Sequence, residues 1–311
     1  MENAKLKNMP LRSLAFNFIT FFTIIIPLNI LAQNSFSPQF YEREETLVNI
    51  YNNDPQNEQN LISMGELYAS EKIWDLAIDS YEKLVDLDPD NSDYLYRLGG
   101  TQAAYSEVAN KFRVLSIINS AKKNLIKSAS LDTNHIYSRW ALVQILTELP
   151  QILGGDKDVA LKYCNEILNI SYVHGLLSYH YFYSFKNNEG LILDTEIKIF
   201  DEIQSNPILF EFNHFNFVVG KLLINTGTSQ FNLALRYLNR YLLNYSSADR
   251  FSLEEVYYYL AYCNFYLGNS NSLTLLKKSK EIALKSQKKN YNLISKIEEL
   301  NKLMNQWEFI L

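Results

Sequence analysis

The strongest constraint on the fold of this chain is a short turn-forming string that returns at a fixed distance. Asp54–Asn57 reads Asp-Pro-Gln-Asn and Asp88–Asn91 reads Asp-Pro-Asp-Asn, so the two prolines lie 34 residues apart. A looser copy at Leu131–Asn134 follows 44 residues after Leu87–Asp90, so this unit carries about ten extra residues. A fixed period of this length is typical of stacked structural repeats.

The best-defined repeat unit covers residues 58–91 and has the pattern of two amphipathic helices. Apolar residues recur at spacings of three and four on each predicted helix: Leu61, Met64, Gly65 and Tyr68 on the first, and Ala77, Tyr81 and Leu84 on the second. Such a stripe marks one buried helix face. One helix pair has no means of burying both stripes by itself, so the sequence predicts that successive pairs stack.

This unit resembles the tetratricopeptide (TPR) repeat family, in which Gly65 and Ala77 are the small residues that let the helices approach and Pro89 closes the unit. Weaker units extend the resemblance over roughly residues 40–290. It implies an all-α fold, an α-α superhelix of about six helix pairs plus a terminal helix. We expect a lead-in helix within residues 33–57, repeats over residues 58–288, and a capping helix within residues 289–311.

The turn inside the third unit, Leu149–Asp156, is longer than the usual repeat turn. Asp156 is expected to cap the following helix because a short acidic side chain accepts hydrogen bonds from free backbone N–H groups there. Gly154 and Gly155 are expected to supply unusual backbone angles. No Gly-Lys-Ser/Thr follows them, so a phosphate-binding loop is not indicated.

Residues 1–32 have the layout of a secretory signal peptide. Basic residues up to Arg12 precede an apolar run, Leu14–Leu31, and Ala32 supplies a small residue at the expected cut. We therefore expect export to the periplasm or the cell exterior and no membrane span after cleavage. The alternative is an uncleaved anchor in the inner membrane, since about 18 apolar residues nearly cross a bilayer.

Composition and motifs argue against nucleic-acid binding and catalysis. The formal charge of the whole chain is −5, which is not the basic footprint of a nucleic-acid-binding protein. The four histidines form no His-Glu-x-x-His pattern, and no nucleophile or dinucleotide motif is present. We expect no catalytic residue, no metal and no cofactor. Cys164 and Cys263 lie in apolar patterns and are interpreted as core thiols, although export also permits a disulfide.

The inner face of a TPR stack is lined by the first helix of each pair. In the second unit the family geometry places Asp93, Tyr96, Gly100 and Ala103 there. Lys and Asn, which clamp an acidic C-terminus in some family members, are absent from these positions, so that ligand is not expected.

The later units place aromatic and charged residues at the corresponding positions: Phe217 and Lys221 in the fifth unit, and Glu255, Tyr258, Tyr262 and Phe265 in the sixth. Tyr offers a large contact area with a polar tip, which suits recognition of a peptide or protein. The alternative interpretation is that these rings fill the core between helices. The sequence leaves both interpretations open.

These features together predict a protein-binding scaffold of the bacterial cell envelope with no enzymatic activity, which recognises a peptide or protein partner through the concave groove. Two alternatives remain. One is a repeat protein that binds a glycan or small ligand through its aromatic residues, and the other is an accessory subunit of an envelope enzyme or transporter. The fold class does not name the ligand.

Overall fold

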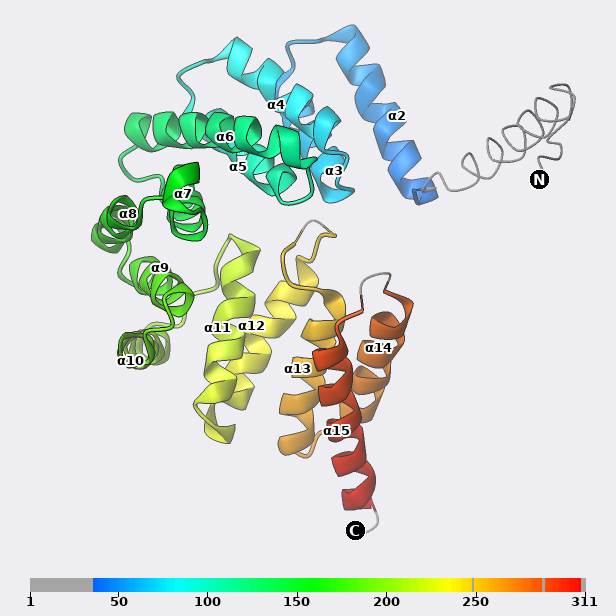
Figure 1. Ribbon diagram of the computed structural model, residues 1–311. Helices are drawn as coiled ribbons and strands as arrows, with labels where there is room; N and C mark the ends of the chain where they lie inside the picture. The colour runs from blue at the N-terminus through cyan, green and yellow to red at the C-terminus, as the bar shows by residue number, and fades with distance from the viewer. Residues whose placement is uncertain (1–35, 248, 287–288, 309–311) are drawn as a thin grey trace, which may run out of the picture. The chain divides into compact units, whose positions relative to one another are not determined.

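The structure is a computed structural model that describes residues 36–247, 249–286 and 289–308. These residues form fourteen α-helices and no β-strand (Figure 1). In the same part of the chain, none of the helices combines the length and the apolar character needed to cross a membrane. The predicted signal peptide, residues 1–32, lies outside the described residues. The chain divides into two compact units, residues 1–53 and 54–311.

The described part of the first unit is one helix, α2 (Pro38–Asn53). Proline suits the first helical position because its missing N–H would be unpaired there anyway. The rings of Phe36, Phe40 and Tyr41 contact one another at its start, with centroids 4.5 to 6.2 Å apart.

The second unit consists of helix pairs, each formed by two consecutive helices packed side by side (Figure 1). The pairs are α3 (Glu58–Ser70) with α4 (Trp74–Leu87), α5 (Ser92–Ser106) with α6 (Lys111–Leu131), α7 (Ile136–Glu148) with α8 (Lys157–Ile170), α9 (Tyr172–Phe185) with α10 (Glu189–Ser205), α11 (Asn213–Asn225) with α12 (Phe231–Leu243), and α13 (Leu253–Tyr266) with α14 (Ser272–Lys285). Helix α15 (Tyr291–Glu308) follows the sixth pair, and short 3-10 helices precede α8 and α12. The predicted all-α repeat fold, with six pairs and a terminal helix, is confirmed.

The recurring string proves to be a turn that ends one pair and starts the next. The carboxylates of Asp54, Asp88 and Asp132 each accept a hydrogen bond from the backbone N–H two residues later, at 3.3, 3.2 and 2.8 Å. Asn57 and Asn91 then cap α3 and α5 through their side-chain oxygens. The string thus combines a turn with a helix cap in front of α3 and α5, whereas the looser third copy keeps the Asp132 turn and uses His135 as the cap of α7.

Small residues set the distance between the helices of a pair, as expected. A Cβ atom added to Gly65 would lie 2.3 Å from the ring of Tyr81, and one added to Gly99 would lie 2.8 Å from Leu125. Ala77 faces α3 with no exposed surface. These close contacts leave no space for larger side chains, so the small residues are a packing requirement of the helix pair.

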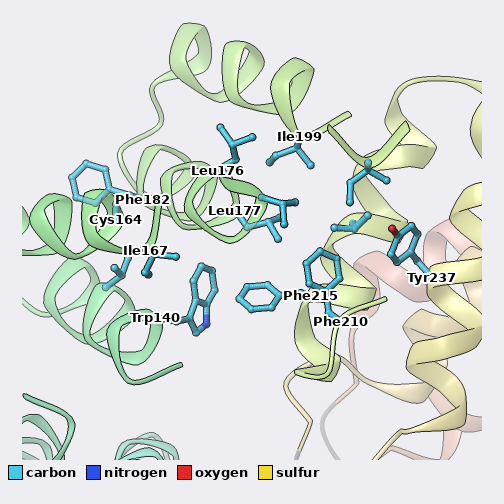
Figure 2. Close-up of a cluster of buried hydrophobic side chains, with 14 of the residues drawn as sticks. Trp140, Cys164, Ile167, Leu176, Leu177, Phe182, Ile199, Phe210, Phe215 and Tyr237 are labelled. Carbon is cyan, nitrogen blue, oxygen red and sulfur yellow. The ribbon is translucent and has the colours of Figure 1, made fainter. Parts of the chain in front are cut away.

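Successive pairs share a core. One cluster of buried residues runs from Leu125 in α6 to Cys263 in α13 and includes Trp140, Phe215 and Tyr237 (Figure 2). No single pair contains this cluster, which agrees with stacking as the way in which the apolar stripes are buried. Cys164 and Cys263 are both buried and free, so the interpretation as core thiols is confirmed.

The long turn of the third pair follows the prediction with one correction. Gly154 has a φ of 87°, and Asp156 caps α8 by accepting from the N–H of Val159 at 3.0 Å. Gly155 does not have a positive φ, so the expected role of its backbone angle is wrong. Glycine is needed there for space, since a Cβ would lie 1.9 Å from the carbonyl oxygen of Leu149.

Candidate partner-binding cavity

The second unit encloses a cavity of about 470 Å³, which we call the inner cavity. Its wall is formed mainly by α5 and α7, the first helices of the second and third pairs. The α3–α4 turn, the start of α11 and the two residues Asp249 and Arg250, which precede α13, complete it. Residues from distant parts of the chain therefore meet around one space.

Helix α5 contributes Tyr96, Gly100 and Ala103 to the wall, and Glu107 follows directly after its last residue, Ser106. Their spacing of four, three and four residues places them on one helix face. Tyr96, Gly100 and Ala103 are thus on the inner side of the stack that the family geometry indicated. Contact of Tyr96 with a partner stays a prediction.

Helix α7 contributes Tyr137, Ala141, Gln144 and Glu148, which have the same spacing of four, three and four residues. The sequence analysis did not assign these residues to the site. The two sets of residues share this spacing, and each has a tyrosine first, a small residue second and a glutamate last. This similarity between the second and third repeat units is the sequence signal that could have identified the α7 residues.

Aromatic side chains form a continuous shelf along the cavity. The ring centroids of Tyr96 and Tyr137 lie 6.0 Å apart, and those of Tyr137 and Phe212 lie 5.5 Å apart. His214 stacks on Phe212 at 5.6 Å and also contacts Trp140 at 5.6 Å. Rings arranged in this way present a large, stiff contact surface with a few polar atoms.

Two polar groups in the shelf are unusual. The Nε1–H of Trp140 is buried and has no hydrogen-bond partner among the described residues. Figure 2 shows this nitrogen on the edge of the indole that faces away from Leu177. Burial, with a smaller effect of Arg250, lowers the pKa of His214 to about 4, so its imidazole is neutral near pH 7.

Charged side chains also line the cavity. Glu148 accepts a hydrogen bond from the hydroxyl of Tyr181 and pairs with Arg250, whose Nη2 is 3.2 Å from its carboxylate. The residues on either side of Arg250 are held in place, because Asn213 donates to Asp249 at 3.1 Å and the hydroxyl of Tyr241 donates to the carbonyl of Phe251 at 2.7 Å.

The aromatic residues predicted from the later units lie elsewhere. Phe217 is fully buried and stacks on Phe251 with centroids 4.0 Å apart, which is the core arrangement that the sequence analysis kept as its alternative. Tyr258 is only 8% exposed and packs in a cluster with residues of α15, so it too has a core position, and contact of either residue with a partner stays a prediction. Tyr262 and Phe265 are half-buried against the same cluster. The physical reason is that α15 packs on α13 and covers the side that the prediction left open.

Lys221 and Glu255 pair with each other at 3.5 Å, and the Lys221 ammonium lies over the ring of Tyr259 at 5.5 Å. Neither residue is part of the inner cavity wall. Their predicted contact with a partner stays untested, and in this structure each is the other's electrostatic partner.

Within the described residues, no group of three or more His, Cys, Asp or Glu side chains is placed to hold a metal ion.

No protein-family model matches the sequence, and no curated protein matches it significantly. Similar solved structures include a TPR protein from Parabacteroides merdae, 11% identical, with 83% of this chain and 92% of that chain covered and a TM-score of 0.47. PilF of Pseudomonas aeruginosa is 11% identical, with 79% and 96% covered and a TM-score of 0.44. A thermophilic TPR protein from Thermus thermophilus is 15% identical, with 78% and 97% covered and a TM-score of 0.35.

The chain is a TPR-like helical-repeat protein. Its own features support this: the 34-residue spacing of the capped turn, the six stacked pairs, and the contact of Gly65 with Tyr81. The three solved structures are all less than 20% identical and have TM-scores below 0.5. The likeness concerns the helical-repeat fold, so the ligand of these TPR-like repeats has to be inferred from the side chains of this chain.

Proposed function

We propose that the TPR-like repeats form a binding scaffold that holds a segment of a protein partner in the inner cavity. The observation that carries the proposal is an aromatic shelf beside open space. A Cβ added to Gly100 would meet only the ring of Tyr96, at 3.8 Å. Small residues at Gly100, Ala103 and Ala141 thus leave space over the rings of Tyr96 and Tyr137.

The size and composition of the cavity favour a peptide segment. A volume of about 470 Å³ accommodates a few side chains and is too small for a folded domain. An aromatic centre with a charged rim is the usual composition of a protein-recognition surface. The rim carries both signs of charge, which is unlike the basic surface of a nucleic-acid site.

The proposed setting is the bacterial cell envelope, with the chain exported and its signal segment removed. The support is the sequence of residues 1–32 alone. Mass spectrometry of the protein from its native host tests this, since an N-terminus near Gln33 is expected. A chain that retains Met1 and sediments with inner membranes would favour the anchored alternative. An accessory role beside an envelope enzyme or transporter is compatible with the same partner-binding cavity.

The aromatic shelf also supports a second candidate, a glycan ligand, because sugars stack on ring faces such as those of Tyr96 and Tyr137. Binding to a glycan array without binding to any peptide would favour this candidate. The charged mouth and the buried Trp140 N–H favour the peptide.

The test uses a matched pair of substitutions. Gly100→Trp fills the inner cavity, whereas Gly190→Trp places the same side chain on α10, where the nearest atom to an added Cβ is 4.0 Å away. Random dodecapeptides displayed on phage are selected on the unmodified protein and then measured on both variants. We expect selected peptides to bind the unmodified protein and Gly190→Trp and to lose binding to Gly100→Trp. Equal binding to both variants, or no selected peptide at all, would refute the proposed function.

A further inference from the structure

We propose that the partner segment carries a cationic side chain, Lys or Arg, that binds between Glu107 and Glu148 at the mouth of the inner cavity. In the chain without its partner, Arg250 occupies this place. The inference rests on the proposed function and names the chemistry of the ligand at the same site.

The charges that line the cavity leave an excess of negative charge at its mouth. The acidic residues there are Glu107, Glu148 and Asp249, and the basic residues are Lys72 and Arg250. Glu148 is paired with Arg250. The side-chain carboxylate of Glu107 makes no hydrogen bond or ion pair within 4 Å among the described residues, and the hydrogen-bond donors to Asp249 are neutral: the Asn213 amide and the backbone N–H of Ser246.

Arg250 lies under the influence of both glutamates. Burial by itself lowers the pKa of Arg250, but Tyr181, Glu148 and Glu107 outweigh burial and raise it. A guanidinium is thus stabilised at the point where Glu107 and Glu148 line the cavity. A partner's Lys or Arg would meet the same two carboxylates.

The contact made by Arg250 is suited to exchange. Its side chain is 46% exposed and that of Glu148 is 39% exposed, and such exposed ion pairs are weak. The two neighbours of Arg250 are held separately, because Asn213 donates to the carboxylate of Asp249 and the hydroxyl of Tyr241 donates to the carbonyl of Phe251. The guanidinium is therefore able to leave Glu148 without loss of these two hydrogen bonds.

A second, independent feature indicates a peptide main chain. Trp140 lines the cavity, and its buried Nε1–H has no partner among the described residues; a peptide carbonyl oxygen is the kind of acceptor that it lacks. The open space over Gly100 and Ala103 accepts an apolar side chain. The ligand that satisfies all three features is a segment with an apolar residue next to a basic one.

Arg250 provides a test whose sign depends on the charge of the ligand. A cationic ligand competes with Arg250, so Arg250→Ala strengthens binding. An acidic ligand would instead use Arg250 and Lys72, so the same substitution would weaken binding. The direction in which Arg250→Ala changes the binding affinity therefore distinguishes a cationic ligand from an acidic one.

The probes are three fluorescein-labelled decapeptide pools with the same randomised Leu/Phe/Tyr centre and with flanks of Lys/Arg, Ser/Gln or Asp/Glu. Binding is measured by fluorescence polarisation, and circular dichroism verifies the fold of each variant. We expect the Lys/Arg pool to bind best and to weaken as salt rises. Arg250→Ala should tighten its binding about two- to fivefold, and Glu107→Gln and Glu148→Gln should each weaken it by a similar factor. Arg236→Ala on α12 and Glu189→Gln on α10, both exposed and outside the cavity, are matched controls that should change nothing.

Preference for the Asp/Glu pool, or weaker binding after Arg250→Ala, would overturn the inference. So would the absence of binding to every pool when phage selection yields peptides that Gly100→Trp fails to bind. In those cases the proposed function stands and only the assigned ligand charge fails. If phage selection yields no peptide and Gly100→Trp changes nothing, the proposed function itself fails.

Discussion

Replacing Gly65 by alanine tests the packing that defines the helix pair. The added Cβ would lie 2.3 Å from Cε1 and 2.4 Å from Cζ of Tyr81, where carbon atoms normally approach to about 3.5–4.0 Å. Tyr81 is only 4% exposed, so its ring has little space into which to move. The same substitution at Gly100, in the next first helix, meets only the Tyr96 ring at 3.8 Å.

The expected change in the free energy of unfolding follows from two opposing effects. Both substitutions gain helix propensity, about 1 kcal/mol for Gly to Ala in a helix interior. Only Gly65→Ala also overpacks the pair, which typically costs about 1–3 kcal/mol. We therefore expect Gly100→Ala to raise the free energy of unfolding by up to about 1 kcal/mol. Gly65→Ala should be less stable than Gly100→Ala by about 1–3 kcal/mol.

The assay is urea unfolding followed by circular dichroism, with hydrogen exchange of the α3 and α4 amides as a local measure. The local measure is needed because stability in a repeat stack varies along the chain. Faster exchange in α3 and α4 is expected for Gly65→Ala alone. Equal stability and equal exchange in the two variants would refute the reasoning that Gly65 is required by the Tyr81 contact.

Three further predictions concern buried polar groups. Arg139→Leu should lower the free energy of unfolding, measured in urea, by about 3–5 kcal/mol. The reason is that the buried guanidinium pairs with Glu166 at 2.9 Å, and its loss leaves that carboxylate unpaired. A decrease below about 1 kcal/mol would contradict this prediction. Burial lowers the pKa of His174 from 6.5 to about 4, so the unfolded chain binds a proton first and stability should fall as pH drops through that window. Melting temperatures across the window should show this loss, and His174→Gln should reduce it. Burial raises the pKa of Cys164 to about 11 and that of Cys263 to about 12. A thiol reagent should therefore label both cysteines only after the protein unfolds. Rapid labelling of the folded protein would show that the thiols are accessible and would contradict the prediction.

The sequence left open which aromatic residues reach the cavity and which fill the core. Phe217 and Tyr258 have the spacing of inner-face residues, and so do Tyr96 and Tyr137. Periodicity identifies the face of a helix but not what lies opposite that face. For Tyr258 the opposite element is α15, and for Phe217 it is the segment that contains Phe251.

The amino-acid sequence by itself determined the helix pair, its turn and its caps. These depend on contacts within about 40 residues, such as Gly65 with Tyr81 and the cap by Asn91, so their signals recur in the sequence. Only the tertiary structure decided where the inner cavity lies. Arg250 meets Glu148 across 102 positions of the chain, and no local pattern specifies such a contact, because it depends on how all the intervening pairs stack.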